Sequence, residues 1–215
     1  MSEQQDWSIE GVLTTARRKH DGFKANFFVA LLIYLAITAA IEFARGSILP
    51  GSTDATSPSI FIEIAITILI SPLSIGLGLF GVRRAVGKET PVSTLWEPYA
   101  AAIPLMVMMG LAIALIIAGL VLFILPGIYL AVAYSFAAFL ITEKGMGVWQ
   151  ALEASREAIT EYWWRYFGLM LMSALLMLLG ALPALIGLIW VLPILVIANG
   201  EVFAHTFNDG EQSNS

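Results

Sequence analysis

The sequence has no cysteine and very little charge. Without cysteine the chain can form no disulfide, no thiolate nucleophile and no cysteine-ligated metal centre. Its two histidines are too few for a histidine-rich metal site. Charged residues make up 13% of the 215 residues and hydrophobic residues 59%, whereas soluble domains are about 25% charged. With a mean hydropathy of +0.84, this composition excludes the soluble class and predicts an all-α membrane protein.

Long apolar runs predict the membrane spans, because about 20 mostly apolar residues cross about 30 Å of hydrocarbon. The first two runs extend from Asn26 to Phe43 and from Ile60 to Val82. The uncharged run from Ala100 to Ile141 would be about 63 Å long as one helix, so it must fold as a hairpin. The run from Tyr166 to Gly200 repeats this situation. We therefore predict a polytopic bundle of six transmembrane helices within residues 26–208.

Proline and glycine indicate where the two hairpins turn. Pro126 and Gly127 should form the first turn, at the outer surface, since proline removes a backbone donor and glycine permits positive φ. The second turn lies either near Gly180–Pro183 or at Leu192–Pro193, and hydropathy leaves both open. We favour a structural turn at Pro193, because it occupies the position of Pro126 in a sequence repeat.

This repeat relates residues of the second half of the chain at a constant spacing of 67. The pairs are Trp96 and Trp163, Tyr99 and Tyr166, Leu125-Pro126 and Leu192-Pro193, Ala131 and Ala198, and Phe136 and Phe203. Both hairpins leave and return to the same face, so the copies would be parallel repeats. Transporters use internal repeats, and structural membrane proteins can also arise by duplication.

The basic residues predict that both termini are cytoplasmic, since Lys and Arg gather on that side. Ten of the eleven lie in the N-terminal segment, in the loop after the second span and in the loop after the fourth. Arg45 alone lies opposite. The interfacial residues Trp96, Trp163 and Trp164 stand where spans three and five leave this face, as an aromatic belt requires.

Two segments outside the spans have amphipathic helical spacing. In residues 145–162 one helical face is apolar and the other is mostly acidic; the apolar face holds Val148, Trp149, Leu152, Ile159 and Tyr162. This pattern predicts a helix lying in the membrane interface, as a connector or as a docking element. Residues 1–25 form a cytoplasmic segment with a shorter helix of this kind, and residues 209–215 are expected to be a disordered cytoplasmic tail.

Three acidic residues lie in or at the edge of spans. Glu42 is expected to pair with Arg45 at a boundary, and Glu201 to lie at the interface. Glu63, about one turn inside the second span, is the candidate functional residue, since an ionisable group within a span is a functional hypothesis by default. The alternative is that it caps its helix or reaches outward. One carboxylate is too little for hydrolysis, so we expect no enzyme and no cofactor.

The motif Gly76-x-Gly78-x-x-Gly81 has the spelling of a dinucleotide-binding fingerprint. That fingerprint needs a βαβ unit, and here the motif stands inside an apolar span. It instead predicts close helix packing by small residues. Small residues spaced by four from Gly110 predict the same, either within the bundle or in a homodimer.

Several motifs occur in a distinctive order between Pro72 and Phe207. They are Leu125-Pro126-Gly127-Ile128-Tyr129, Ala133-Tyr134-Ser135-Phe136, Ala151-Leu152-Glu153-Ala154-Ser155, Trp164-Arg165-Tyr166-Phe167 and Leu192-Pro193. This series resembles bacterial proteins of the YciC type, the domain-of-unknown-function family nine-seven-five and the membrane domain attached to some glycerophosphodiester phosphodiesterases. The resemblance implies a six-span bacterial inner-membrane protein and provides no catalytic residues. The phosphodiesterase catalytic domain is absent from this sequence, so its activity is not expected.

The sequence therefore predicts a non-enzymatic inner-membrane protein that assists or scaffolds other membrane components. The alternative is a small transporter or carrier with a site between the repeated hairpins, and it depends on the repeat and on Glu63. The expected partners are the lipid bilayer and a membrane protein or further copies of the chain. The few, scattered basic residues exclude nucleic acid.

Overall fold

The computed structural model describes residues 7–19, 24–48, 59–181 and 187–207, which are helical throughout most of their length and contain no strand. The helices are α1 (Ile9–Lys19), α2 (Lys24–Ile48), α3 (Ser59–Ala85), η1 (Val92–Leu95), η2 (Glu97–Ala101), α4 (Ala102–Leu122), α5 (Ile124–Ala133), α6 (Ala137–Lys144), α7 (Val148–Ala181) and α8 (Leu188–Phe207). Within these ranges, six helical stretches are long and apolar enough to cross a membrane. The predicted all-α membrane fold is confirmed.

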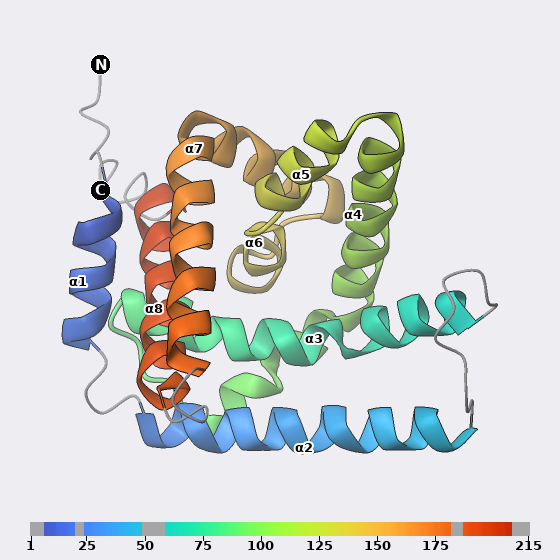
Figure 1. Ribbon diagram of the computed structural model, residues 1–215, viewed down its shortest axis with the longest axis horizontal. Coiled ribbons are helices and arrows are strands. Elements are labelled where there is room, and N and C mark those ends of the chain that lie inside the picture. The colour runs from blue at the N-terminus through green and yellow to red at the C-terminus, as the bar shows by residue number, and fades with distance from the viewer. Residues whose placement is uncertain (1–6, 20–23, 49–58, 182–186, 208–215) are drawn as a thin grey trace.

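The helices do not all run in one direction. Figure 1 shows α2 and α3 side by side along one edge of the molecule, with α4, α7 and α8 running across them. Helix α1 lies on the outer side of α8, and α5 and α6 lie between α4 and α7. The most extensive contact between helices joins α3 to α8.

Glycine makes the close contacts of α3 with α8 and with η1 possible. A Cβ on Gly81 would lie 1.9 Å from the carbonyl oxygen of Val196 in α8, and one on Gly76 would lie 2.2 Å from the carbonyl oxygen of Leu95 in η1. A side chain at either position would collide with backbone, so the helices could not approach this closely. The prediction that this glycine motif serves helix packing is confirmed.

Helix α3 continues through a proline. Pro72 has no N–H to donate to the carbonyl of Ile68, four residues earlier. The hydroxyl of Ser71 donates to that carbonyl instead, at 2.7 Å. The serine therefore satisfies the acceptor that the proline leaves behind.

A short hairpin joins α4 to α5. Phe123 links them in an extended conformation, and its N–H donates to the carbonyl oxygen of Gly119 at 2.9 Å. Pro126 follows in the first turn of α5, where a helix does not need an N–H. A Cβ on Gly127 would lie 2.3 Å from Cγ of Leu120, so glycine is required for the two helices to pack this closely.

The expected turn at Pro193 is wrong. Pro193 lies inside α8, which begins at Leu188, whereas α7 ends at Ala181. The ends of these helices meet, because a Cβ on Gly187 would lie 2.6 Å from the carbonyl oxygen of Gly180. The chain therefore reverses between α7 and α8, close to the alternative turn near Gly180–Pro183. Pro183 itself lies outside the described residues.

Context explains why the two prolines differ. Pro193 deprives only the carbonyl of Ile189 of a helical donor, and Ile189 lies in the first turn of α8, so the helix accommodates the proline near its start. Pro126 follows a break that already exists at Phe123. The matching Leu-Pro pairs therefore do not mark equivalent turns.

Candidate functional site

Glu63 lies in an ion pair. Its Oε1 is 3.3 Å from Nη1 of Arg45, near the start of α3 and the end of α2. Arg45 also binds Glu42, with Nη2 2.6 Å from Oε2, which confirms the expected Glu42–Arg45 pair. The Glu63 side chain is 49% exposed. This carboxylate is therefore one of two that share a guanidinium at the ends of two helices.

A second polar cluster joins the chain segments around η2. Nε of Arg83 donates to Oε1 of Glu143 at 3.0 Å, and its Nη1 and Nη2 bind the carboxylate of Glu97. Nζ of Lys88 lies 3.5 Å from the second oxygen of Glu143. Arg83 thus ties the end of α3 to η2 and to the end of α6. Nearby, Lys144 donates to the carbonyl oxygen of Phe207, at the end of α8.

The fourth apolar stretch is broken between α5 and α6, at residues 134–136. The hydroxyl of Ser155 spans the break, since it accepts from the N–H of Phe136 at 3.2 Å and donates to the carbonyl of Ala133 at 2.6 Å. Ser155 is fully buried. In a membrane, irregular backbone persists only where protein groups satisfy it, and this serine does so.

Aromatic rings and one polar pair surround the break. Phe136 lies at the centre, with ring centroids 5.0 Å from Tyr166 and 5.8 Å from Phe203. The hydroxyl of Tyr166 donates to Oδ1 of Asn199 at 3.0 Å, and Nδ2 of Asn199 donates to the carbonyl of Leu195. These groups connect α7 and α8 to the broken segment. They satisfy one another, so the arrangement stabilises the fold.

The sequence did not single out Ser155, although a signal was present. Ser155 falls on the face that Leu152 and Ile159 form, and both of these are buried. A polar residue on the buried face of an amphipathic helix needs a hydrogen-bonding partner. The predicted amphipathic segment itself is the first part of α7, which departs from helical geometry at Tyr162. Trp149, expected on the apolar face, is exposed.

The three predicted interface tryptophans occupy different surroundings. Trp96 is partly exposed and packs against Tyr99, with ring centroids 5.9 Å apart. Trp163 follows the kink in α7 and stacks on Phe167, with centroids 4.9 Å apart and planes 6° apart. Trp164 is exposed. Glu201, expected at the interface, is buried in α8.

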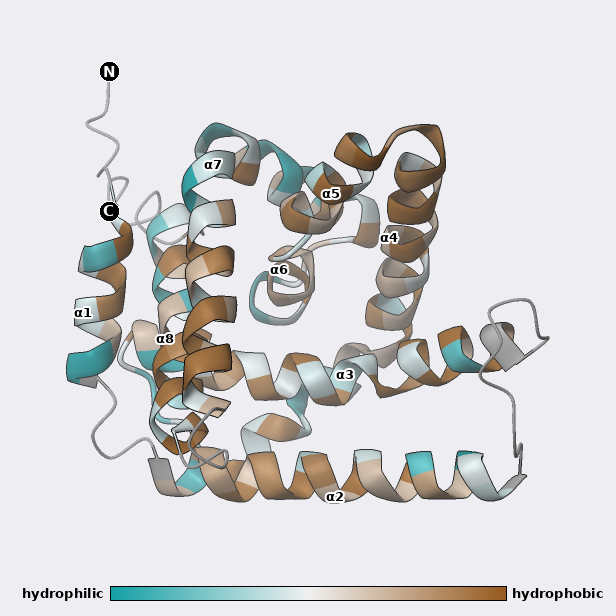
Figure 2. Ribbon diagram, viewed as in Figure 1, coloured by the Kyte–Doolittle hydropathy of each residue, from teal (hydrophilic) through white to brown (hydrophobic). Residues whose placement is uncertain are grey.

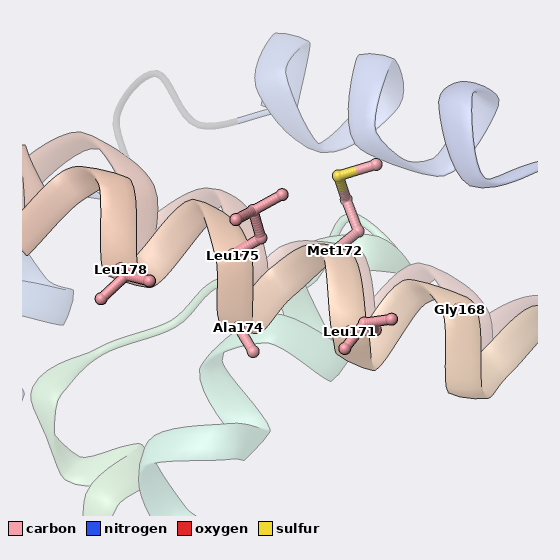
Figure 3. A pocket seen from close by; sticks show the side chains of 6 residues that line it. All are labelled: Gly168, Leu171, Met172, Ala174, Leu175 and Leu178. Carbon is pink, nitrogen blue, oxygen red and sulfur yellow. The ribbon is translucent and has the colours of Figure 1, made fainter.

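An apolar hollow lies along α7 (Figure 3), with a volume of about 420 Å³. Its lining residues all belong to this helix: Gly168, Leu171, Met172, Ala174, Leu175 and Leu178. The two small residues, Gly168 and Ala174, leave room between the longer side chains. No ionisable or hydrogen-bonding side chain lines the hollow, so it suits an apolar occupant rather than an ion or a polar solute.

Metal-ligating side chains do not gather in groups of three or more within the described ranges. No protein-family model matches the chain, and neither does a curated protein or a solved structure.

Proposed function

We propose that this chain is a non-enzymatic, multi-pass protein of a bacterial inner membrane that assists or scaffolds other membrane components. The resemblance to proteins of the YciC type supports the bacterial inner-membrane assignment. The distribution of Lys and Arg supports cytoplasmic termini. The polar groups of the spans support a structural role, because Glu63 and Tyr166 each bind a partner within the chain.

The hollow on α7 is the observation that carries this proposal. Without a hydrophobic driving force in lipid, membrane helices associate through close van der Waals packing, and small residues permit it. Gly168 and Ala174 are the small residues on this face of α7. The other residues that line the hollow are leucines and a methionine, and their side chains are exposed. The partner that fits is a transmembrane helix of another membrane protein.

Native mass spectrometry of the protein extracted from its own membrane in mild detergent tests the proposal. We expect a complex with a second membrane protein in a fixed stoichiometry. Ala174→Trp fills the hollow and should release that partner. Val29→Trp, at an exposed apolar position of α2, is the matched control and should retain it. A wild-type protein that carries only phospholipid, or a partner that Ala174→Trp leaves bound, would contradict the scaffold.

One observation favours the alternative, a small carrier. Broken helices line the substrate sites of many secondary transporters, and the fourth apolar stretch is broken beside Tyr166 and Asn199. A carrier predicts that a small ligand raises the thermal stability of the purified protein, and that Asn199→Leu abolishes this effect. The scaffold predicts no such ligand.

A further inference from the structure

The tip of the α4–α5 hairpin is an exposed apolar patch. The large side chains of Val121, Leu122, Phe123, Ile124 and Leu125, called the tip here, are 69% to 80% exposed. No polar side chain occurs between Ala100 and Ile128. Figure 2 shows the hydrophobic colour over most of α4 and around the turn.

The connected ends of α2 and α3 carry charged side chains, unlike the tip. Where these helices meet, charged side chains gather, with Arg45 between Glu42 and Glu63. Such residues, or tyrosine and tryptophan, are usual where a span meets headgroups and water. The tip has none of them. Its composition is that of a segment surrounded by hydrocarbon.

Two backbone positions at the tip present no free donor to hydrocarbon. The N–H of Phe123 is satisfied by Gly119, at 2.9 Å, and Pro126 has no N–H to satisfy. At these two positions the turn leaves no unsatisfied donor, each of which would cost several kcal/mol in lipid.

A tyrosine fixes the depth of the tip. The hydroxyl of Tyr129 lies 2.5 Å from Oγ1 of Thr160, in the first part of α7. That part of α7 is polar and charged, with Arg156 paired to Glu153 and with Glu157 exposed. It must lie at a membrane surface. Phe123 precedes Tyr129 by six residues, about 9 Å along a helix, whereas the hydrocarbon is about 30 Å thick.

We infer that the α4–α5 hairpin is re-entrant: its tip is inserted among phospholipid acyl chains in the leaflet that borders the polar part of α7, and it does not emerge on the opposite face. This goes beyond the proposed function and does not depend on it. The sequence had placed Pro126 at the outer surface. Fusions on either side of the hairpin cannot separate the two arrangements, because the chain returns to the same face in both.

Single cysteines test the inference cleanly, because the natural sequence has none. Phe123→Cys and Leu125→Cys replace exposed side chains and should not disturb the fold. Gly46→Cys and Gly147→Cys are the controls for the two faces, since a Cβ at either position meets no atom within 4 Å. Each thiol is labelled with an environment-sensitive fluorophore in spheroplasts and in inverted membrane vesicles. A phospholipid carrying a nitroxide on its acyl chain is then added, and it enters only the exposed leaflet.

We expect the tip labels to be quenched several-fold more strongly in the preparation that exposes Gly147 than in the one that exposes Gly46. We also expect a membrane-impermeant maleimide to react with the face controls and with neither tip cysteine. Reaction of the tip on the Gly46 face, or quenching from that leaflet alone, would overturn the inference. So would a tip that no nitroxide quenches, because protein would then cover it.

Discussion

Gly81 and Gly200 meet where α3 packs against α8, and a Cβ on Gly200 would lie 2.2 Å from the carbonyl oxygen of Gly81. The obstacle on each side is backbone, which cannot rotate away as a flexible side chain would. The two helices therefore fix each other's position through their main chains.

Alanine at this contact should destabilise the protein. We expect Gly200→Ala to lower the free energy of unfolding by about 1–3 kcal/mol, the cost of overpacking a close-packed interior. Gly46→Ala is the control, because its Cβ meets nothing within 4 Å. It should be neutral or stabilising by about 0.5–1 kcal/mol, since alanine favours a helix. Equilibrium unfolding in mixed micelles measures both, and equal stability of the two variants would contradict the packing described.

Removing the Ser155 hydroxyl should loosen the broken segment. Ser155→Ala leaves the buried N–H of Phe136 and the carbonyl of Ala133 without this partner, which should cost about 1–3 kcal/mol. Hydrogen exchange at the Phe136 amide should accelerate in parallel. Ser47→Ala, which removes an exposed hydroxyl bound to its own helix, should change neither measurement. Unchanged exchange at Phe136 would show that Ser155 does not hold the break.

Loss of Arg83 should separate α6 from the end of α3. Arg83→Met leaves Glu143, which is only 13% exposed, with the more distant Lys88. We expect a loss of about 1–2 kcal/mol, between the values for exposed and buried ion pairs. Adding Glu143→Gln should restore part of this stability, because the uncompensated charge is removed. A double variant less stable than Arg83→Met would argue against the pairing.

Glu63→Gln should be nearly silent if the carboxylate only completes an exposed ion pair with Arg45. Its thermal stability and its cellular level should match those of the wild type, because exposed ion pairs contribute little. A carrier coupled to an ion or proton predicts the opposite for function, with normal protein level and lost activity. Growth complementation of a deletion strain separates the two, and failure of Glu63→Gln to complement would favour the carrier.

The orientation of the chain can be measured with reporter fusions. Reporters placed after Lys88, after Gly145 and after Ser215 should all report the cytoplasm, and one at Thr53 should report the periplasm, since basic residues are retained inside. A periplasmic signal at Ser215 would contradict the predicted orientation and an even number of crossings, whether the α4–α5 hairpin spans the membrane or is re-entrant.

Hydropathy and glycine spacing were sufficient to predict the helices and the role of Gly76 and Gly81, because both depend on the local sequence. The partner of each glycine was not predictable, since Gly76 packs against Leu95 in η1 and Gly81 against Val196 in α8, more than a hundred residues further along the chain. The prediction of a turn at Pro193 was wrong because the sequence Leu-Pro occurs both near the start of helices and in turns. Only the position of Leu188, where α8 begins, separates the two cases.

The candidate site was predictable in part. Glu63 was found because a carboxylate within an apolar run stands out, but its binding to Arg45 depends on how the ends of α2 and α3 are placed. Ser155 was passed over because serine is common in connecting segments. Its position on the buried face beside Leu152 was the available sign.

The contact between Gly81 and Gly200 also has a consequence for biogenesis. During synthesis, α3 enters the membrane long before α8 has been made. Until then, the face of α3 that carries Gly81 is not packed against α8. Long-range contacts of this kind form late and leave surfaces exposed to wrong pairings in the meantime. A ribosome that stalls before Leu188 would release a chain whose α3 still lacks that neighbour. Such truncated chains should be preferred targets of membrane proteases and insertase-associated chaperones, whereas chains cut after Phe207 should escape them.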